Sequence, residues 1–178
     1  MTVPAWHEEP INKTQKRDSF DCGDDALNVY LRNFARQNHE RGGAKTFLAL
    51  SDADARVLGY YSLAPAQVEY EQTPESLRKG LSRHPIPGFR LARLATDQFV
   101  QGSGLGTQLL LTAGRRCLQV ADLTGGAALF IDAKHERAAA WYEARGAERL
   151  SVEADGNPLA LFISLKTIEA ALRAAGKL

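Results

Sequence analysis

The sequence is poor in cysteine, has no long apolar run and carries almost no net charge. Its two cysteines, Cys22 and Cys117, lie far apart and match no metal-ligand spacing, which disfavours a disulfide or a zinc site. No apolar stretch approaches the roughly 18 residues that cross a bilayer, and residues 1–13 lack the apolar core of a signal peptide. We therefore expect a cytoplasmic protein with no membrane segment and no metal site.

The positive charge is concentrated in the middle of the chain, although the net charge is only +1. Residues 30–93 hold ten basic and six acidic side chains, residues 1–29 hold three and six, and residues 94–178 hold nine of each. These basic residues are either solvated faces of helices and loops or a footprint for nucleic acid. Composition alone leaves both interpretations open.

The hydrophobic pattern predicts one α/β domain over residues 1–178, long enough to bury a core without disulfides. The expected helices lie within residues 20–43, 73–80, 105–121 and 135–146, with a helical C-terminal tail at 167–178. The expected strands are two that flank a turn at residues 52–54, followed by 89–99, 127–133 and 159–165. Asp21 or Asp24 is the expected N-cap of the first helix, which Gly42 and Gly43 should end.

A glycine-rich stretch, residues 101–106 (QGSGLG, the glycine loop), separates a strand-like run from a helix-like run. Backbone N–H groups at the N-terminus of a helix, with no side chains over them, suit a phosphate or pyrophosphate. The Walker pattern fails because Thr107 and Gln108 follow Gly106 where Lys and Ser or Thr are required. The dinucleotide fingerprint fails because Thr107 replaces its third glycine.

The glycine loop matches the Q/R-x-x-G-x-G/A pattern of the GNAT family of N-acetyltransferases. Further motifs make the chain resemble the acetyltransferase toxins of type II toxin–antitoxin systems, which acetylate aminoacyl-tRNA. These motifs are FDCG at 20–23, LN at 27–28, GYY at 59–61, RLATD at 93–97 and AAAWYEARGA at 138–147. Ala92 and Ala147 depart from the residues usual in that group, glycine and an aromatic residue, which affects the expected acceptor pocket more than the cofactor site.

The resemblance implies a single GNAT-type domain, with a mixed, mostly antiparallel sheet flanked by helices and splayed around an acetyl-CoA site. It implies acetyl-CoA as cofactor, a homodimer, and an antitoxin of the ribbon-helix-helix type as partner. The implied cofactor-binding residues are Leu94, Ala95, Thr96, Gln101, Gly102, Ser103, Gly104, Leu105, Gly106 and Thr107.

The resemblance also implies that Tyr142 is the general acid that protonates the departing thiolate. The alternative interpretation is that Tyr142, beside Trp141 on a helix, only packs in the core. The sole acidic residue near the end of the strand before the glycine loop is Asp97, which is either a base or a structural residue. A backbone N–H between Leu94 and Thr96 is the expected donor to the carbonyl oxygen.

The acceptor class depends on what removes a proton from the amine. A lysine amine, with a pKa of about 10.4, costs about 4.6 kcal/mol to deprotonate at pH 7, whereas an α-amine costs only about 1 kcal/mol. Many members of the family that the chain resembles place a glutamate, as the base, in the strand before the glycine loop, and this sequence has none there. Its absence fits an acceptor of low pKa such as charged tRNA. The candidate tRNA contacts are Arg36, Lys45, Arg78, Lys79, Arg83, Arg90 and Arg93. An N-acetyltransferase for small amines or protein amines, and a module that only binds, remain alternatives.

Overall fold

The computed structural model describes residues 1–150 and 159–178. Its elements are β1 (Trp6–Pro10), α1 (Asp25–Asn33), α2 (Ala35–Glu40), β2 (Lys45–Ser51), β3 (Val57–Val68), η1 (Tyr70–Gln72), α3 (Glu75–Arg78), β4 (Ile86–Thr96), η2 (Gln98–Val100), α4 (Leu105–Thr124), β5 (Ala128–Asp132), α5 (Glu136–Glu143), β6 (Glu148–Arg149), β7 (Ala160–Ser164) and α6 (Leu165–Ala174). Within the described residues, no helix is both long and apolar enough to cross a membrane.

The strands form a seven-stranded sheet in the order β1-β2-β3-β4-β5-β7-β6. The pairs β1–β2, β2–β3, β5–β7 and β6–β7 are antiparallel, whereas β4 and β5 are parallel. The predicted mixed, mostly antiparallel sheet flanked by helices is therefore confirmed.

The chain divides into two compact units. Unit 1 comprises Met1–Ala64 and Ala92–Thr112, and unit 2 comprises Pro65–Leu91 and Ala113–Leu178. Strands β3 and β4 and helix α4 each contribute residues to both units. The single domain over residues 1–178 stays a prediction, and its residues 151–158 lie outside the described part of the chain.

The first expected helix is two helices in the structure. Asp24 is the N-cap of α1 and accepts hydrogen bonds from the N–H groups of Ala26 and Leu27. The helix breaks at Phe34, whose backbone lies outside helical geometry at φ −125° and whose side chain is 55% exposed. The break turns Phe34 outward while Ala35, the first residue of α2, is fully buried. The sequence predicted one helix here because its hydrophobic spacing gives no sign of a break at Phe34.

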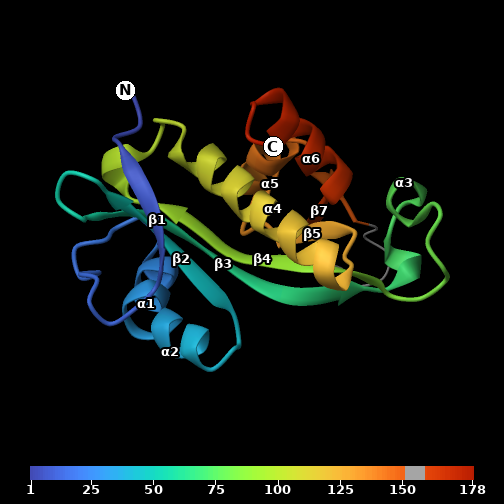
Figure 1. The fold of residues 1–178 in the computed structure, drawn as a ribbon, viewed down its shortest axis with the longest axis horizontal. Helices are drawn as coiled ribbons and strands as arrows, with labels where there is room; N and C mark the ends of the chain where they lie inside the picture. The colour runs from blue at the N-terminus through green and yellow to red at the C-terminus, as the bar shows by residue number, and fades with distance from the viewer. Residues whose placement is uncertain (151–158) are drawn as a thin grey trace. The chain divides into compact units, whose positions relative to one another are not determined.

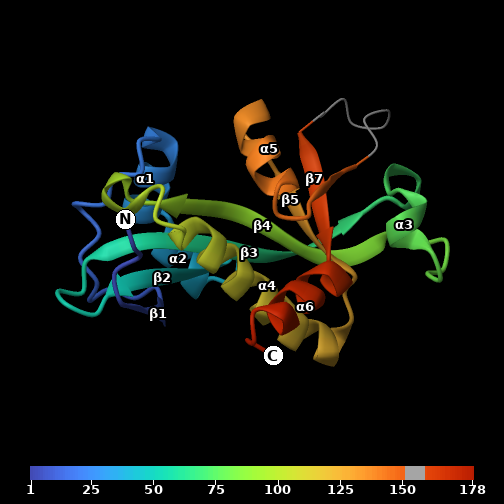
Figure 2. The ribbon, with the colours of Figure 1, turned by 90° about the horizontal axis from the view of Figure 1, so that it is seen from above.

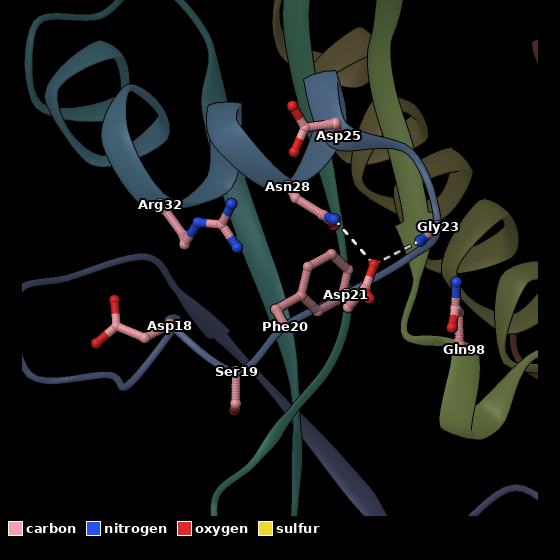
Figure 3. A pocket seen from close by; sticks show the side chains of 9 residues that line it. All are labelled: Asp18, Ser19, Phe20, Asp21, Gly23, Asp25, Asn28, Arg32 and Gln98. Carbon is pink, nitrogen blue, oxygen red and sulfur yellow. Dashed lines mark hydrogen bonds between the residues drawn. The ribbon is translucent and has the colours of Figure 1, made fainter.

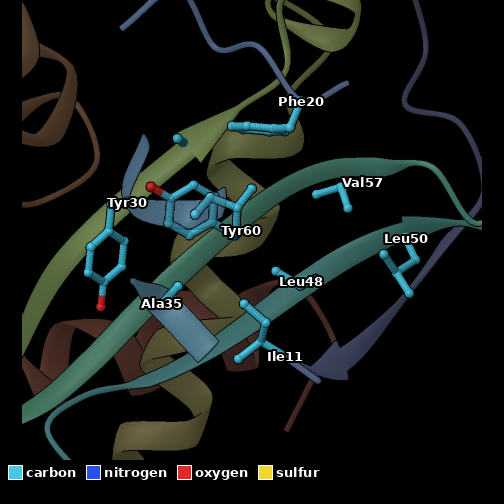
Figure 4. Close-up of a cluster of buried hydrophobic side chains, with 10 residues drawn as sticks. Ile11, Phe20, Tyr30, Ala35, Leu48, Leu50, Val57 and Tyr60 are labelled. Carbon is cyan, nitrogen blue, oxygen red and sulfur yellow. The ribbon is translucent and has the colours of Figure 1, made fainter. Parts of the chain in front are cut away.

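Unit 1 is built on β1, β2, β3 and the end of β4. Tyr60 of β3 packs with Tyr30 and Leu31 of α1 in one core cluster (Figure 4). A side chain at the neighbouring Gly59 would instead point to Leu109 of α4. Because successive strand residues face opposite sides of a sheet, α1 and the first half of α4 cover opposite faces, as Figure 1 shows.

Unit 2 has its own core around β5 and β7. Phe130 of β5, Phe162 of β7 and Ile86 of β4 belong to one buried cluster. Helix α6 packs closely against α4, since a Cβ at Gly114 would lie 2.6 Å from the side chain of Ile168, and Figure 2 shows the two helices side by side. Helix α6 is thus part of the packed unit and begins at Leu165, two residues before the expected tail.

Candidate functional site

The glycine loop connects η2 to α4 within unit 1. Gly102 and Gly104 have φ of +81° and +100°, a region that side chains disfavour, and a Cβ at either position would meet nothing within 4 Å. Helix α4 then runs for 20 residues. Its first intrahelical hydrogen bond runs from the Gln108 N–H to the Gly104 carbonyl, so the N–H groups of Leu105 and Gly106 have no acceptor within the helix. An open loop followed by the positive end of a long helix fits an anionic group such as a pyrophosphate.

The Gln101 side chain is turned back into the protein. Its Nε2 donates to the carbonyl oxygens of Cys22 and Thr96, both at 2.9 Å. Ser103 is also engaged locally, since its Oγ donates to the carbonyl of Val100. Among the predicted cofactor residues before the loop, Ala95 is buried in the core of unit 1, whereas Leu94 and Thr96 are half-buried.

Asp97 follows β4 and is 3% exposed. Its carboxylate accepts hydrogen bonds from the N–H of Asp21 at 3.1 Å, the N–H of Phe99 at 2.9 Å and Nη2 of Arg56 at 3.3 Å. A carboxylate surrounded by three donors caps η2 and joins three chain segments. Of the two interpretations of Asp97, these contacts support the structural one.

A polar pocket of about 590 Å³ lies in unit 1, and all of its lining residues come earlier in the chain than the glycine loop (Figure 3). Its lining residues are Asp18, Ser19, Phe20, Asp21, Gly23, Asp25, Asn28, Arg32 and Gln98. Hydrogen bonds from the Gly23 N–H and the Asn28 amide lower the pKa of Asp21. Three carboxylates against one guanidinium make this pocket unsuitable for a phosphate. Sequence reasoning missed it, although the FDCG motif marks its position.

Tyr142 lies on α5 in unit 2, near the C-terminal end of the helix. The His135 ring caps this helix at its start by accepting from the N–H of Ala138, and Gly146 ends it with φ of +97°. Trp141 packs edge-on against the Tyr142 ring, with 5.0 Å between the centroids. Desolvation raises the pKa of Tyr142 to about 12, so its hydroxyl stays protonated throughout the physiological range.

The seven candidate tRNA residues are divided between the two units. Arg36, Lys45 and Arg93 belong to unit 1. Arg36 pairs with Glu40 at 2.7 Å, Lys45 donates to the His39 carbonyl, and the Arg93 guanidinium stacks on a tyrosine ring. The structure therefore does not bring all seven together in one unit.

Unit 2 holds the other four candidates, Arg78, Lys79, Arg83 and Arg90. Arg78 stacks on Tyr70, with its guanidinium carbon 4.8 Å from the ring centroid, and Arg90 forms an ion pair with Asp132. Lys79 and Arg83 are exposed. Three of the four, Arg78, Lys79 and Arg83, lie within one short stretch of the chain.

Solved structures place the fold in the class of GNAT-type acetyltransferase toxins. The toxin AtaT in complex with acetyl-methionyl-tRNAfMet has a TM-score of 0.86 and 28% identity, and the match covers 94% of this chain and 99% of that chain. A tyrosine-to-phenylalanine variant of AtaT, bound to the C-terminus of the antitoxin AtaR and to acetyl-CoA, has a TM-score of 0.78 and 28% identity over 94% of this chain and 98% of that chain.

No protein-family model matches the sequence. A tRNA-acetylating toxin of Mycobacterium tuberculosis strain H37Rv is 40% identical over 124 residues, which are 70% of this chain and 73% of that protein. The chain belongs to the family of tRNA-acetylating toxins.

Proposed function

We propose that this protein transfers the acetyl group of acetyl-CoA to the α-amino group of an aminoacyl-tRNA, and thereby acts as a toxin that blocks translation. The observation that carries the proposal is the open glycine loop at the start of α4, in a chain 40% identical to a tRNA-acetylating toxin. The same loop would serve other acetyltransferases, so the acceptor rests on the relatives and on the chemistry of the site.

The proposed cofactor-binding residues lie at the end of β4 and in the glycine loop, Leu94–Thr96 and 102–107, whereas the side chain of Gln101 is turned back into the protein. Backbone N–H groups at the start of α4 would bind the pyrophosphate, and a backbone N–H between Leu94 and Thr96 would donate to the carbonyl oxygen as it gains charge. Acetyl-CoA supplies an activated thioester when bound. The complex of the AtaT variant with acetyl-CoA supports this assignment.

Tyr142 is the proposed general acid toward the departing thiolate. A complete proton transfer from a phenol of pKa about 12 to a thiolate of pKa about 8.5 is uphill by about 5 kcal/mol. Tyr142 therefore acts by donating a hydrogen bond that strengthens as negative charge develops on sulfur; the phenol keeps its proton, and the released thiolate takes one from solvent. Its raised pKa keeps the hydroxyl in the donor form.

The contacts of Asp97 favour an acceptor amine of low pKa. Its carboxylate already accepts three hydrogen bonds, so it is a poor general base. No other acidic residue occurs between Ile86 and Gly106. An α-amine with a pKa of about 7.7 to 8.0 loses its proton to water at a cost of only about 1 kcal/mol at pH 7, and esterification to tRNA lowers that cost.

The partners proposed for this protein follow those of its structural relatives. AtaT forms complexes with tRNA and with the antitoxin AtaR. The proposal for this chain is an aminoacyl-tRNA acceptor, a cognate antitoxin of the ribbon-helix-helix type and a homodimer. Because charged tRNA is the acceptor, the proposed place of action is the cytoplasm.

The decisive experiment incubates the protein and labelled acetyl-CoA with separate acceptor pools: total aminoacyl-tRNA, deacylated tRNA, tRNA-free protein extract and small amines. Label should enter only the aminoacyl-tRNA, and mild alkaline hydrolysis should release it as an N-acetyl amino acid. The Tyr142→Phe variant should transfer almost none. Label in the protein extract or the small amines alone would replace the proposed acceptor with a protein or small-molecule amine.

A further inference from the structure

The segment before α1, residues 21–23 (the α1 lead-in), lies beside the base of the glycine loop although the two are far apart in sequence. The N–H of Gln98 donates to the carbonyl of Asp21 at 2.8 Å, and the N–H of Asp21 donates to the Asp97 carboxylate at 3.1 Å. A Cβ at Gly23, which has φ of +86°, would lie 2.7 Å from the Gln98 amide. The two segments are thus in close contact within unit 1.

Gln101 supplies the connection nearest to the glycines. Its Nε2 bears two hydrogens, and the carbonyls of Cys22 and Thr96 accept one each. Since both neighbours are acceptors, the nitrogen rather than the oxygen of the amide must face them. Neither hydrogen of the Gln101 side-chain amide is left for a pyrophosphate, and the side-chain oxygen would repel one.

The α1 lead-in is itself held rigidly. Asn28 of α1 is 6% exposed and accepts from the N–H of Cys22 at 2.9 Å. It donates to the Asp21 carboxylate, also at 2.9 Å (Figure 3). Asp21 also accepts from the N–H of Gly23 at 2.9 Å. Hydrogen bonds from Asn28 of helix α1 therefore fix residues 21–23, and these residues in turn contact the base of the glycine loop.

We infer that Gln101 and Asp97 are positioning residues, which fasten the glycine loop to the α1 lead-in and so fix the loop's backbone N–H groups for the cofactor. Neither side chain contacts the cofactor. The inference rests on the proposed binding of acetyl-CoA to the glycine loop, and it assigns to Gln101 a role different from the direct cofactor contact expected from the sequence.

The test is a double-mutant cycle on the full-length protein with Gln101→Leu, Asp97→Asn and the double variant. CoA affinity is measured by calorimetry, and kcat and KM by acetyl transfer to aminoacyl-tRNA. Each single change should raise the Kd for CoA about tenfold, the effect of losing one ordering hydrogen bond. The double variant should be no weaker than the weaker single variant, because both changes release the same loop. Gln37→Leu, at an exposed position of α2, is the matched control and should bind CoA as the wild type does.

If Gln101 and Asp97 only position the loop, their substitution should change the KM for acetyl-CoA and leave kcat unchanged. The KM for acetyl-CoA should rise with the Kd, whereas kcat at saturating acetyl-CoA and the KM for aminoacyl-tRNA should stay within about twofold, since the chemistry is unchanged. Thermal unfolding checks that each variant is folded, and the exposed Gln101 keeps the test valid if Asp97→Asn does not fold.

Every other outcome contradicts either the positioning role of Gln101 and Asp97 or the proposed function. Fully additive losses in CoA affinity, or no loss in either variant, would overturn the inference and leave the proposed function standing. A fall in kcat without a change in KM would make Asp97 or Gln101 part of the chemistry instead. A wild-type protein that does not bind CoA would overturn the proposed function and, with it, the purpose assigned to the two residues.

Discussion

Arg93 stacks on Tyr30, with its guanidinium carbon 3.5 Å from the ring centroid. Tyr30 is 7% exposed, and its hydroxyl accepts a hydrogen bond from Asn38 at 3.0 Å. The stack links the end of β4 to α1, on the side of unit 1 opposite the first half of α4. Arg93 therefore has a structural partner, whether or not it also contacts tRNA.

We predict that Arg93→Ala lowers the free energy of unfolding by about 1 to 2 kcal/mol, the range for a cation–π contact shielded from water. Urea unfolding of Arg93→Ala, Tyr30→Leu and the double variant measures the coupling between the two side chains. The single losses should not add, because either change removes the same contact. Arg41→Ala, at an exposed position, should change the stability by less than about 0.5 kcal/mol. Additive losses would show that the stack contributes nothing of its own.

Tyr142→Phe removes one hydroxyl and keeps the ring that packs against Trp141. We predict that kcat falls by a factor of about 10² to 10³, the range for the loss of one hydrogen-bond donor to a developing negative charge, while CoA binding is unchanged. Steady-state transfer to aminoacyl-tRNA and calorimetry with CoA measure the two quantities. The same substitution at Tyr70, whose ring stacks on Arg78, is the matched control and should leave kcat unchanged. A variant of Tyr142 with normal kcat would support the packing interpretation.

The raised pKa of Tyr142 also predicts a loss of stability at alkaline pH. The unfolded chain releases this proton near pH 10, whereas the folded protein holds it up to about pH 12. Unfolding therefore becomes easier as the pH rises from 10 to 12, and the wild type should lose at most about 3 kcal/mol more than Tyr142→Phe over that interval.

Urea unfolding of the two proteins from pH 7 to 11 checks this prediction. The difference in stability between wild type and Tyr142→Phe should be constant below pH 9 and should then shift in favour of the variant. A difference that stays constant up to pH 11 would mean that the Tyr142 hydroxyl is well solvated in the folded protein.

The elements with strong local signals could be predicted from the sequence. The β2–β3 hairpin, helix α4 and strand β5 follow from regular hydrophobic spacing and from turn residues, and Asp24 is one of the two N-caps expected for α1. The family pattern indicated the glycine loop, and the structure adds that Gly102 and Gly104 adopt positive φ and face open space. These features depend on residues close together in the chain.

The remaining features depend on contacts between distant segments. Strand β1, with the sequence WHEEP, has no alternating apolar pattern and forms because it pairs with the edge of β2, from Trp6 opposite Ser51 to Pro10 opposite Phe47. The hydrogen bond from Gln101 to the Cys22 carbonyl could not be predicted for the same reason, since the two residues lie 79 positions apart. Local patterns can identify the glycine loop but cannot show what holds it in place.

Lys79 and Arg83 are the candidate tRNA contacts least engaged within the protein. Arg83 is 81% exposed at its side chain and lies 3.9 Å from Glu71, and Lys79 is exposed just after α3. Arg36 and Lys45, by contrast, already bind Glu40 and the His39 carbonyl. We therefore expect the phosphate contacts to involve Lys79 and Arg83 more than Arg36 and Lys45.

The salt dependence of tRNA binding tests this expectation, because each phosphate contact contributes about 0.7 to 0.9 to the slope of log affinity against log salt. The double variant Lys79→Ala with Arg83→Ala should lower that slope by about 1.4 to 1.8, whereas Arg36→Ala with Lys45→Ala should change it by less than about 0.5. CoA affinity, measured on the same proteins, should be unaffected in both. The reverse ranking would assign the tRNA surface to unit 1, and an unchanged slope in both double variants would identify these basic residues as solvated faces without a nucleic-acid partner.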